Sequence, residues 1–106
     1  MANSTNPISI GSVQVQDPVW LAPMTGVSDL PFRKLVKGFG AGMVVSEMIA
    51  SRAAIIDNKN FKRMSSFSPE EYPFAIQLAG CDPEIMAEAA KLNEDRGAQI
   101  IDINFG

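Results

Sequence analysis

The sequence predicts an α/β fold: a parallel sheet with helical crossovers that forms the N-terminal part of a TIM (β/α)8 barrel. Short apolar runs alternate along the chain with stretches of helical periodicity, which is typical of parallel strands covered on both faces. No Gly-x-Gly-x-x-Gly motif follows the first predicted strand, and this disfavours a dinucleotide-binding open sheet. The pattern alone leaves two architectures open, the barrel and a doubly wound sheet.

The length of the chain limits how much of a barrel it can form. A complete barrel needs about 250 residues, and this chain has 106. We therefore expect residues 1–18 to be an N-terminal extension and residues 19–106 to supply about three and a half βα units. Because the sheet would then end on an unpaired strand, we expect the 106-residue chain to be a fragment that is not stable alone.

Composition and charge exclude several classes of function. Hydrophobic residues make up 46% and charged residues 20% of the chain, as in an ordinary globular protein. No apolar run approaches the roughly 18 residues that span a bilayer, and the polar N-terminus does not resemble a secretory signal. The absence of histidine excludes Ser-His-Asp catalysis and most zinc sites, so no metal is expected. The single cysteine favours the cytoplasm, and the net charge of −3 argues against a basic nucleic-acid module.

The first predicted elements are a hairpin and a short strand. Alternating apolar residues around Gly11-Ser12 predict the hairpin: Ile8, Ile10, Val13 and Val15. The first buried strand is predicted over Val19–Ala22 and ends at Pro23, which cannot donate a ladder hydrogen bond.

The first helix follows this strand. Ser28 or Asp29 can cap it, and Pro31 lies in its first turn. Helical spacing predicts a buried face made of Phe32, Leu35, Val36 and Phe39. Gly38 and Gly40 supply the stop signal.

Two more strands and a second helix are predicted next. Met43–Val45 is the second strand, a helix is expected over roughly Ala50–Asp57, and Asn58–Glu71 reads as a polar segment. The third strand, Phe74–Leu78, follows Pro73.

The third helix has the clearest boundaries in the sequence. Asp82 is its predicted N-cap, Pro83 its first residue, and Gly97 its end. Its predicted buried face is Ile85, Met86, Ala89 and Leu92. The fourth strand is Ile100–Asn104, and the chain ends at Gly106.

Polar residues, proline or methionine occur near the carboxyl ends of the predicted strands, where a plain apolar run would otherwise continue. In such folds ligands bind beyond these carboxyl ends. The positions are Pro23-Met24-Thr25, Ser46-Glu47-Met48, Gln77 and Asn104. The amides of Gln77 and Asn104 can match a carbonyl and a ring N–H together, as on the edge of uracil or of a flavin. Taken singly, such an amide is more often a satisfied loop residue than a ligand.

Three other residues have competing interpretations. Glu47 is either a ligand to a hydroxyl, or an orienting carboxylate, or a structural salt-bridge partner. Asp102 lies within an apolar strand, so we expect it to be paired or hydrogen-bonded. Cys81 precedes a helix N-terminus, which can lower a thiol pKa, but without a neighbouring base a small loop residue is the simpler interpretation.

One basic cluster follows the second strand and consists of Arg52, Lys59, Lys62 and Arg63. In a barrel, part of this cluster could reach the ligand-binding face and contact RNA phosphates. The alternative is a solvated helix surface, which is the usual role of a run of charges.

Several segments of the chain, in order, resemble tRNA-dihydrouridine synthases, most closely the bacterial DusB branch. They are Leu21–Asp29, Pro31–Arg33, Ser46–Met48, Pro73–Gly80 and Asp102–Gly106. The resemblance implies an FMN-dependent barrel followed by a helical tRNA-binding domain. The implied reaction is the NADPH-driven reduction of the uridine C5–C6 bond in tRNA.

The resemblance also implies roles for individual residues. Pro23, Met24 and Thr25 would lie against the FMN, Gln77 would hydrogen-bond the isoalloxazine edge, and Asn104 would hold the target uracil beside the flavin. Glu47 and the basic cluster are further candidates for substrate binding. The general acid of the family is the cysteine of a Gly-Cys-Pro motif, which here would follow Gly106, so Cys81 is not assigned this role.

Two other functions remain as alternatives. One is another FMN-dependent barrel oxidoreductase that acts on a small molecule such as a pyrimidine ring. The other is a non-catalytic binding or regulatory module. A reading frame that continues with Cys-Pro after Gly106 would favour the enzyme, and a stop codon would favour the module.

Overall fold

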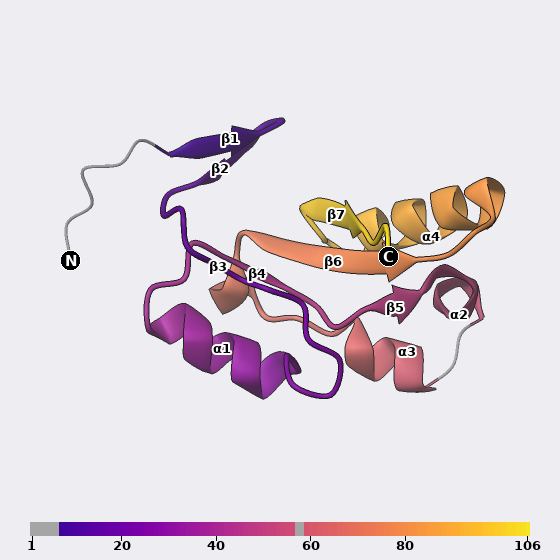
Figure 1. Cartoon of the computed structure of the whole chain (residues 1–106), viewed down its shortest axis with the longest axis horizontal. Coiled ribbons are helices and arrows are strands. Elements are labelled where there is room, and N and C mark those ends of the chain that lie inside the picture. Colours follow the sequence, from indigo (N-terminus) through magenta and orange to yellow (C-terminus); the bar gives the residue numbers. More distant parts are fainter. Residues whose placement is uncertain (1–6, 57–58) are drawn as a thin grey trace.

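The computed structural model describes residues 7–56 and 59–106. A parallel sheet runs through the molecule, with helices packed against it and a separate hairpin near the N-terminus (Figure 1). Among the described residues, every helix is too short or too polar to cross a membrane.

The hairpin forms where the sequence predicted it. Strands β1 (Ile8–Ile10) and β2 (Val13–Val15) pair in an antiparallel ladder. Gly11 adopts a φ of 58° in the turn, a conformation that glycine tolerates without steric cost. Val15 is fully buried and packs with Met43, Val45 and Ala75 of the main sheet.

All strands of the main sheet are parallel, and across the sheet they follow their order along the chain, except that two successive short strands share one edge of the same neighbour. They are β3 (Trp20–Leu21), β4 (Met43–Val45), β5 (Ile49–Ala50), β6 (Phe74–Ala79) and β7 (Ile100–Ile103). This sequential order is the order a (β/α)8 barrel requires, whereas a doubly wound sheet reverses it at a switch point. The first and last predicted strands are shorter than expected, because only Trp20–Leu21 and Ile100–Ile103 pair.

Strands β4 and β5 lie along the same edge of β6, and a short interruption separates them. Val45 pairs with Ala75 and Ile49 pairs with Leu78, so four steps on one strand match three on the other. The extra residue falls within Ser46–Met48 and makes this segment a bulge. The sequence pattern did not predict β5.

The helices of the fold are α1 (Leu30–Gly38), α2 (Ser51–Ile55), α3 (Lys59–Met64) and α4 (Pro83–Asp95), with a 3₁₀ turn, η1 (Pro69–Glu71). The predicted caps are confirmed. Asp29 accepts a hydrogen bond from the Phe32 amide, and Asp82 accepts from the amides of Glu84 and Ile85. The segment expected to be polar, Asn58–Glu71, contains α3 and η1 in its described part, residues 59–71. The predicted helix end at Asp57 lies outside the described residues.

Each face of the sheet has its own core. Ile76 and Leu78 of β6 pack with Ala54 of α2 and Ala89 of α4. Because side chains alternate along a strand, Ala75 points the other way, to the face that the hairpin partly covers. We call this second side the inner face of the sheet.

The predicted buried face of α1 was wrong in part: Phe32 and Val36 are partly buried, but Leu35 and Phe39 are exposed. Leu35 is 59% and Phe39 85% exposed, while the charged Arg33 is only 1% exposed. The helix is therefore rotated from the orientation that its apolar spacing predicts. The reason is a set of polar partners for Arg33 that sequence periodicity does not reveal.

Arg33 is the centre of a buried polar hub. Its Nε donates to Glu71 Oε1 at 2.7 Å, and its terminal nitrogens donate to the carbonyls of Ser28 at 2.9 Å and Ser66 at 2.6 Å. The guanidinium also lies 5.0 Å from the ring centroid of Phe74. The other oxygen of Glu71 accepts from the Ser68 amide. One side chain thus joins the loop after β3, the segment after α3, the turn η1 and strand β6.

Removing the charge of Arg33 should destabilise the fold strongly. Arg33→Leu leaves the buried Glu71 carboxylate and two carbonyls without their donor, which costs about 3–5 kcal/mol. The measurement is urea unfolding of the complete protein that contains this chain.

The adjacent Lys34 provides a matched control, since its pair with Glu70 is exposed and 3.6 Å long. Lys34→Leu should change the free energy of unfolding by no more than about 1 kcal/mol. Equal small effects of the two substitutions would show that the hub does not hold the fold together.

Candidate functional site

The carboxyl ends of the strands bring polar side chains together on the inner face. Gln77 of β6 and Asp102 of β7 are directly paired across the parallel ladder, so their side chains point to the same face. Gln77 is 7% exposed. Asn104 follows β7, and its backbone amide donates to the Leu78 carbonyl, which continues the pairing beyond the strand.

These three side chains form one hydrogen-bonded chain. Gln77 Nε2 donates to Asp102 Oδ2 at 2.7 Å. Asn104 Nδ2 donates to Gln77 Oε1 at 3.3 Å and contacts Met48 Sδ at 3.6 Å. Asn104 Oδ1 accepts from the Gly106 amide at 2.7 Å. The expectation that Asp102 is hydrogen-bonded within its strand is therefore confirmed.

The loop after β3 contains Pro23, Met24 and Thr25 and is held from inside by Ser28. The Ser28 hydroxyl accepts from the Met24 amide at 2.8 Å and lies 3.2 Å from the Met24 carbonyl. Ser28 is fully buried, and its own carbonyl is bound by Arg33. The buried hub thus sets the position of the loop, while Met24 remains 37% exposed.

Glu47 connects the second strand to this same loop. Its Oε1 accepts from the Gly26 amide at 2.6 Å. Gly26 has a φ of 79°, which a side chain would make costly. Among the described residues the ion pairs join Arg33 to Glu71 and Lys34 to Glu70, and neither involves Glu47. Of the interpretations left open by the sequence, the geometry supports the orienting carboxylate, directed at backbone.

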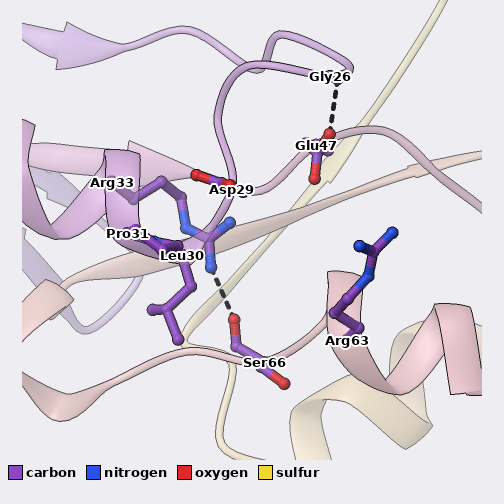
Figure 2. Close-up of a pocket in the computed structure, with 8 residues that line it drawn as sticks. All are labelled: Gly26, Asp29, Leu30, Pro31, Arg33, Glu47, Arg63 and Ser66. Carbon is purple, nitrogen blue, oxygen red and sulfur yellow. Dashed lines mark hydrogen bonds between the residues drawn. The ribbon is translucent and has the colours of Figure 1, made fainter.

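A hollow of about 480 Å³ lies beside this contact (Figure 2). It is lined by Gly26, Asp29, Leu30, Pro31, Arg33, Glu47, Arg63 and Ser66. In Figure 2 Arg63 extends into the space from α3, on the side opposite Asp29 and Leu30. None of the residues predicted to lie against a flavin lines this hollow. Its lining includes the acidic residues Asp29 and Glu47 and the basic residues Arg33 and Arg63.

Three members of the predicted basic cluster line different hollows. Arg63 lines the hollow with Glu47, Lys62 lines a second hollow with Arg96, and Arg52 lines a third with Cys81. All four cationic side chains are exposed. Arg63 is the member of the cluster that shares a hollow with the strand-exit loops.

Other ionisable groups do not add to the site. Cys81 is exposed, and within residues 7–56 and 59–106 no cluster of acidic or cysteine side chains could hold a metal ion. Desolvation lowers the pKa of Lys37, whose ammonium donates to the Gly42 carbonyl, while the charge of Asp17 opposes this shift.

Sequence reasoning singled out Gln77, which lies within β6 near its end, and Asn104, which directly follows β7. It assigned no functional role to Asp102, and it did not link Glu47 to Gly26. The strand register would have revealed the contact of Asp102 with Gln77, because the two residues occupy equivalent positions on neighbouring parallel strands. The contact of Glu47 with Gly26 depends on the bulge between β4 and β5, which no pattern in the sequence predicts.

Comparison with known proteins gives a consistent result. A model of the dihydrouridine synthase (Dus) family matches residues 20–106. A probable tRNA-dihydrouridine synthase of Rickettsia bellii is 55% identical over 100 residues, which cover 93% of this chain and 31% of that protein. Proteins named tRNA-dihydrouridine synthase B from Pseudomonas aeruginosa and Pasteurella multocida are 44% and 42% identical and are covered over 30% and 29% of their length. The chain therefore spans under a third of these curated relatives.

Loss of the Glu47 carboxylate should loosen the loop after β3. Glu47→Ala removes the acceptor of the Gly26 amide, so hydrogen-exchange protection across residues 24–28 should fall about tenfold. Mass spectrometry of deuterated peptides from the complete protein measures this change.

Glu88→Ala is the control, because Glu88 is exposed on α4 and far from the loop in sequence. It should leave the protection of residues 24–28 unchanged. If Glu47→Ala also leaves it unchanged, the carboxylate does not orient the loop.

Proposed function

The chain belongs to the dihydrouridine synthase family, and we propose that the complete protein reduces uridine in tRNA to 5,6-dihydrouridine with FMN as cofactor and NADPH as reductant. In this proposal residues 1–18 are an extension and residues 19–106 are the first part of an FMN-binding barrel. The rest of the barrel and a helical tRNA-binding domain would be supplied by sequence outside these residues. The family match favours this function over a small-molecule oxidoreductase or a non-catalytic module.

The observation that carries the proposal is the hydrogen-bonded amide pair on the inner face, of which Gln77 is buried and Asn104 partly exposed. Gln77 and Asn104 are joined by a hydrogen bond, and each keeps an acceptor lone pair for a further partner. Gln77 also keeps one N–H, because its other hydrogen is taken by Asp102. A donor and an acceptor side by side match the edge of a flavin or of uracil, so the residues present fit the cofactor.

The loop after β3 would form another part of the cofactor site. Pro23, Met24 and Thr25 follow β3 at the same end of the parallel sheet as Gln77 and Asn104. We assign Pro23, Met24, Thr25 and Gln77 to FMN. When bound, FMN would supply the hydride that reduces the C5–C6 bond, while the protein positions it and excludes competing reactions.

Asn104 would hold the target uracil, which must leave its stack in the tRNA to reach such a site. The proton for the reduced ring would come from a cysteine expected directly after Gly106. The Gly106 amide is held by Asn104, so the residue that holds the base would also position the start of the loop carrying that acid.

Arg63 is the basic side chain best placed to reach tRNA. It is exposed and lies in the hollow beside Gly26 and Glu47, next to the strand ends. Arg52, Lys59 and Lys62 are assigned to weaker phosphate contacts, because none of them lines this hollow. A tRNA substrate also agrees with the cytoplasmic location expected from cysteine usage.

The direct test uses the complete protein purified with its cofactor. It should show the absorption spectrum of an oxidised flavin and should convert uridine in unmodified tRNA to dihydrouridine when NADPH is added, as nucleoside mass spectrometry detects. A colourless protein that does not take up FMN would overturn the cofactor assignment. A flavoprotein that reduces a free pyrimidine but not tRNA would overturn the substrate assignment.

Removing the charge of Arg63 should weaken tRNA binding. Arg63→Gln should raise the Kd several-fold and reduce the slope of log Kd against log salt concentration by about one. Filter binding at several salt concentrations measures both quantities.

Lys91→Gln is the matched control, since Lys91 is exposed on α4. It should change neither the Kd nor the slope. An Arg63 variant that behaves like this control would remove Arg63 from the tRNA interface.

A further inference from the structure

Asp102 is an acidic side chain on the inner face for which the proposed function has no role. We propose that Asp102 is a positioning residue: its carboxylate fixes the direction of the Gln77 and Asn104 amides before flavin and uracil bind. This inference rests on the proposed function, because it concerns how the same site is prepared for its ligands.

The geometry of the Gln77–Asp102 contact makes it directional. The two residues face each other across β6 and β7, and Gln77 Nε2 lies 2.7 Å from Asp102 Oδ2. An ionised carboxylate only accepts hydrogen bonds, whereas an amide both donates and accepts. The Gln77 side chain must therefore turn its nitrogen toward Asp102, and its oxygen is directed away from it.

The orientation of the Gln77 amide in turn fixes the orientation of the Asn104 amide. With its oxygen turned away from Asp102, Gln77 accepts from Asn104 Nδ2 at 3.3 Å. The oxygen of Asn104 is then left to accept from the Gly106 amide at 2.7 Å. An amide between neutral partners can rotate and exchange its donor and acceptor, but the charge at one end and the backbone N–H at the other forbid this here.

The β6–β7 pairing does not itself require this contact. The two strands are in register from Ala75 to Leu78 on one side and from Ile100 to Ile103 on the other. The backbone ladder already fixes this register, and the side-chain pair adds a cross-strand contact to it. What Asp102 adds is the orientation of groups that would otherwise have to be ordered when the ligand binds.

The test is a double-mutant cycle on FMN affinity in the complete protein. Asp102→Asn keeps the size of the side chain but lets either end of the Gln77 amide face it. We expect the Kd for FMN, measured by quenching of flavin fluorescence, to rise about tenfold. In a Gln77→Ala background the same substitution should change the Kd by less than about twofold, because Asp102 acts through Gln77.

Two measurements separate positioning from a structural role. The melting temperature of the flavin-free Asp102→Asn protein should stay within a few degrees of the wild type. Asp95→Asn makes the same chemical change at an exposed carboxylate at the end of α4 and should leave the Kd for FMN unchanged. If Asp102→Asn does not fold, the cycle is repeated with Asp102→Ser, which also lacks the charge.

The outcomes distinguish this inference from the proposed function. A wild-type protein that binds FMN together with an Asp102→Asn variant of equal affinity would overturn the role of Asp102 and leave the function standing. Effects of Asp102→Asn and Gln77→Ala that multiply would also overturn it. A wild-type protein that does not bind FMN would remove both proposals.

Discussion

The buried pair of Arg33 and Glu71 is the interaction on which the rest of this structure depends. Both side chains are almost completely withdrawn from solvent, and an uncompensated charge there would be costly. Their remaining hydrogen-bonding groups are satisfied by backbone from separate segments, at Ser28, Ser66 and Ser68. The pair therefore fixes where several loops lie relative to β6, and the position of the candidate cofactor loop follows from it.

The inner face of the sheet changes character along the strands. Ala75 and Ile100 form an apolar layer, and two residues further along each strand the paired side chains are Gln77 and Asp102. The alternation of a strand keeps these polar groups on the same side as the apolar ones. The side chains of this polar layer are hydrogen-bonded to one another, and because Asp102 and Asn104 are only partly buried the layer can still offer atoms to a ligand.

Much of this arrangement could be predicted from the sequence, because its signals are local. The hairpin around Gly11, the cap at Asp82 and the strands that contain Gln77 and precede Asn104 follow from turn chemistry, capping and apolar patterning. The orientation of α1 could not be predicted this way, since it is decided by Glu71, which lies 38 residues from Arg33. The bulge before Ile49 and the contact of Glu47 with Gly26 likewise depend on how separate strands align.

The position of the N-terminal hairpin limits the side from which a ligand can reach the inner face of the sheet. Val15 and Ile10 seal the apolar layer near the start of the strands. In a closed barrel the hairpin would cover the end of the sheet opposite Gln77 and Asn104, so a ligand could reach these polar groups only from their own side.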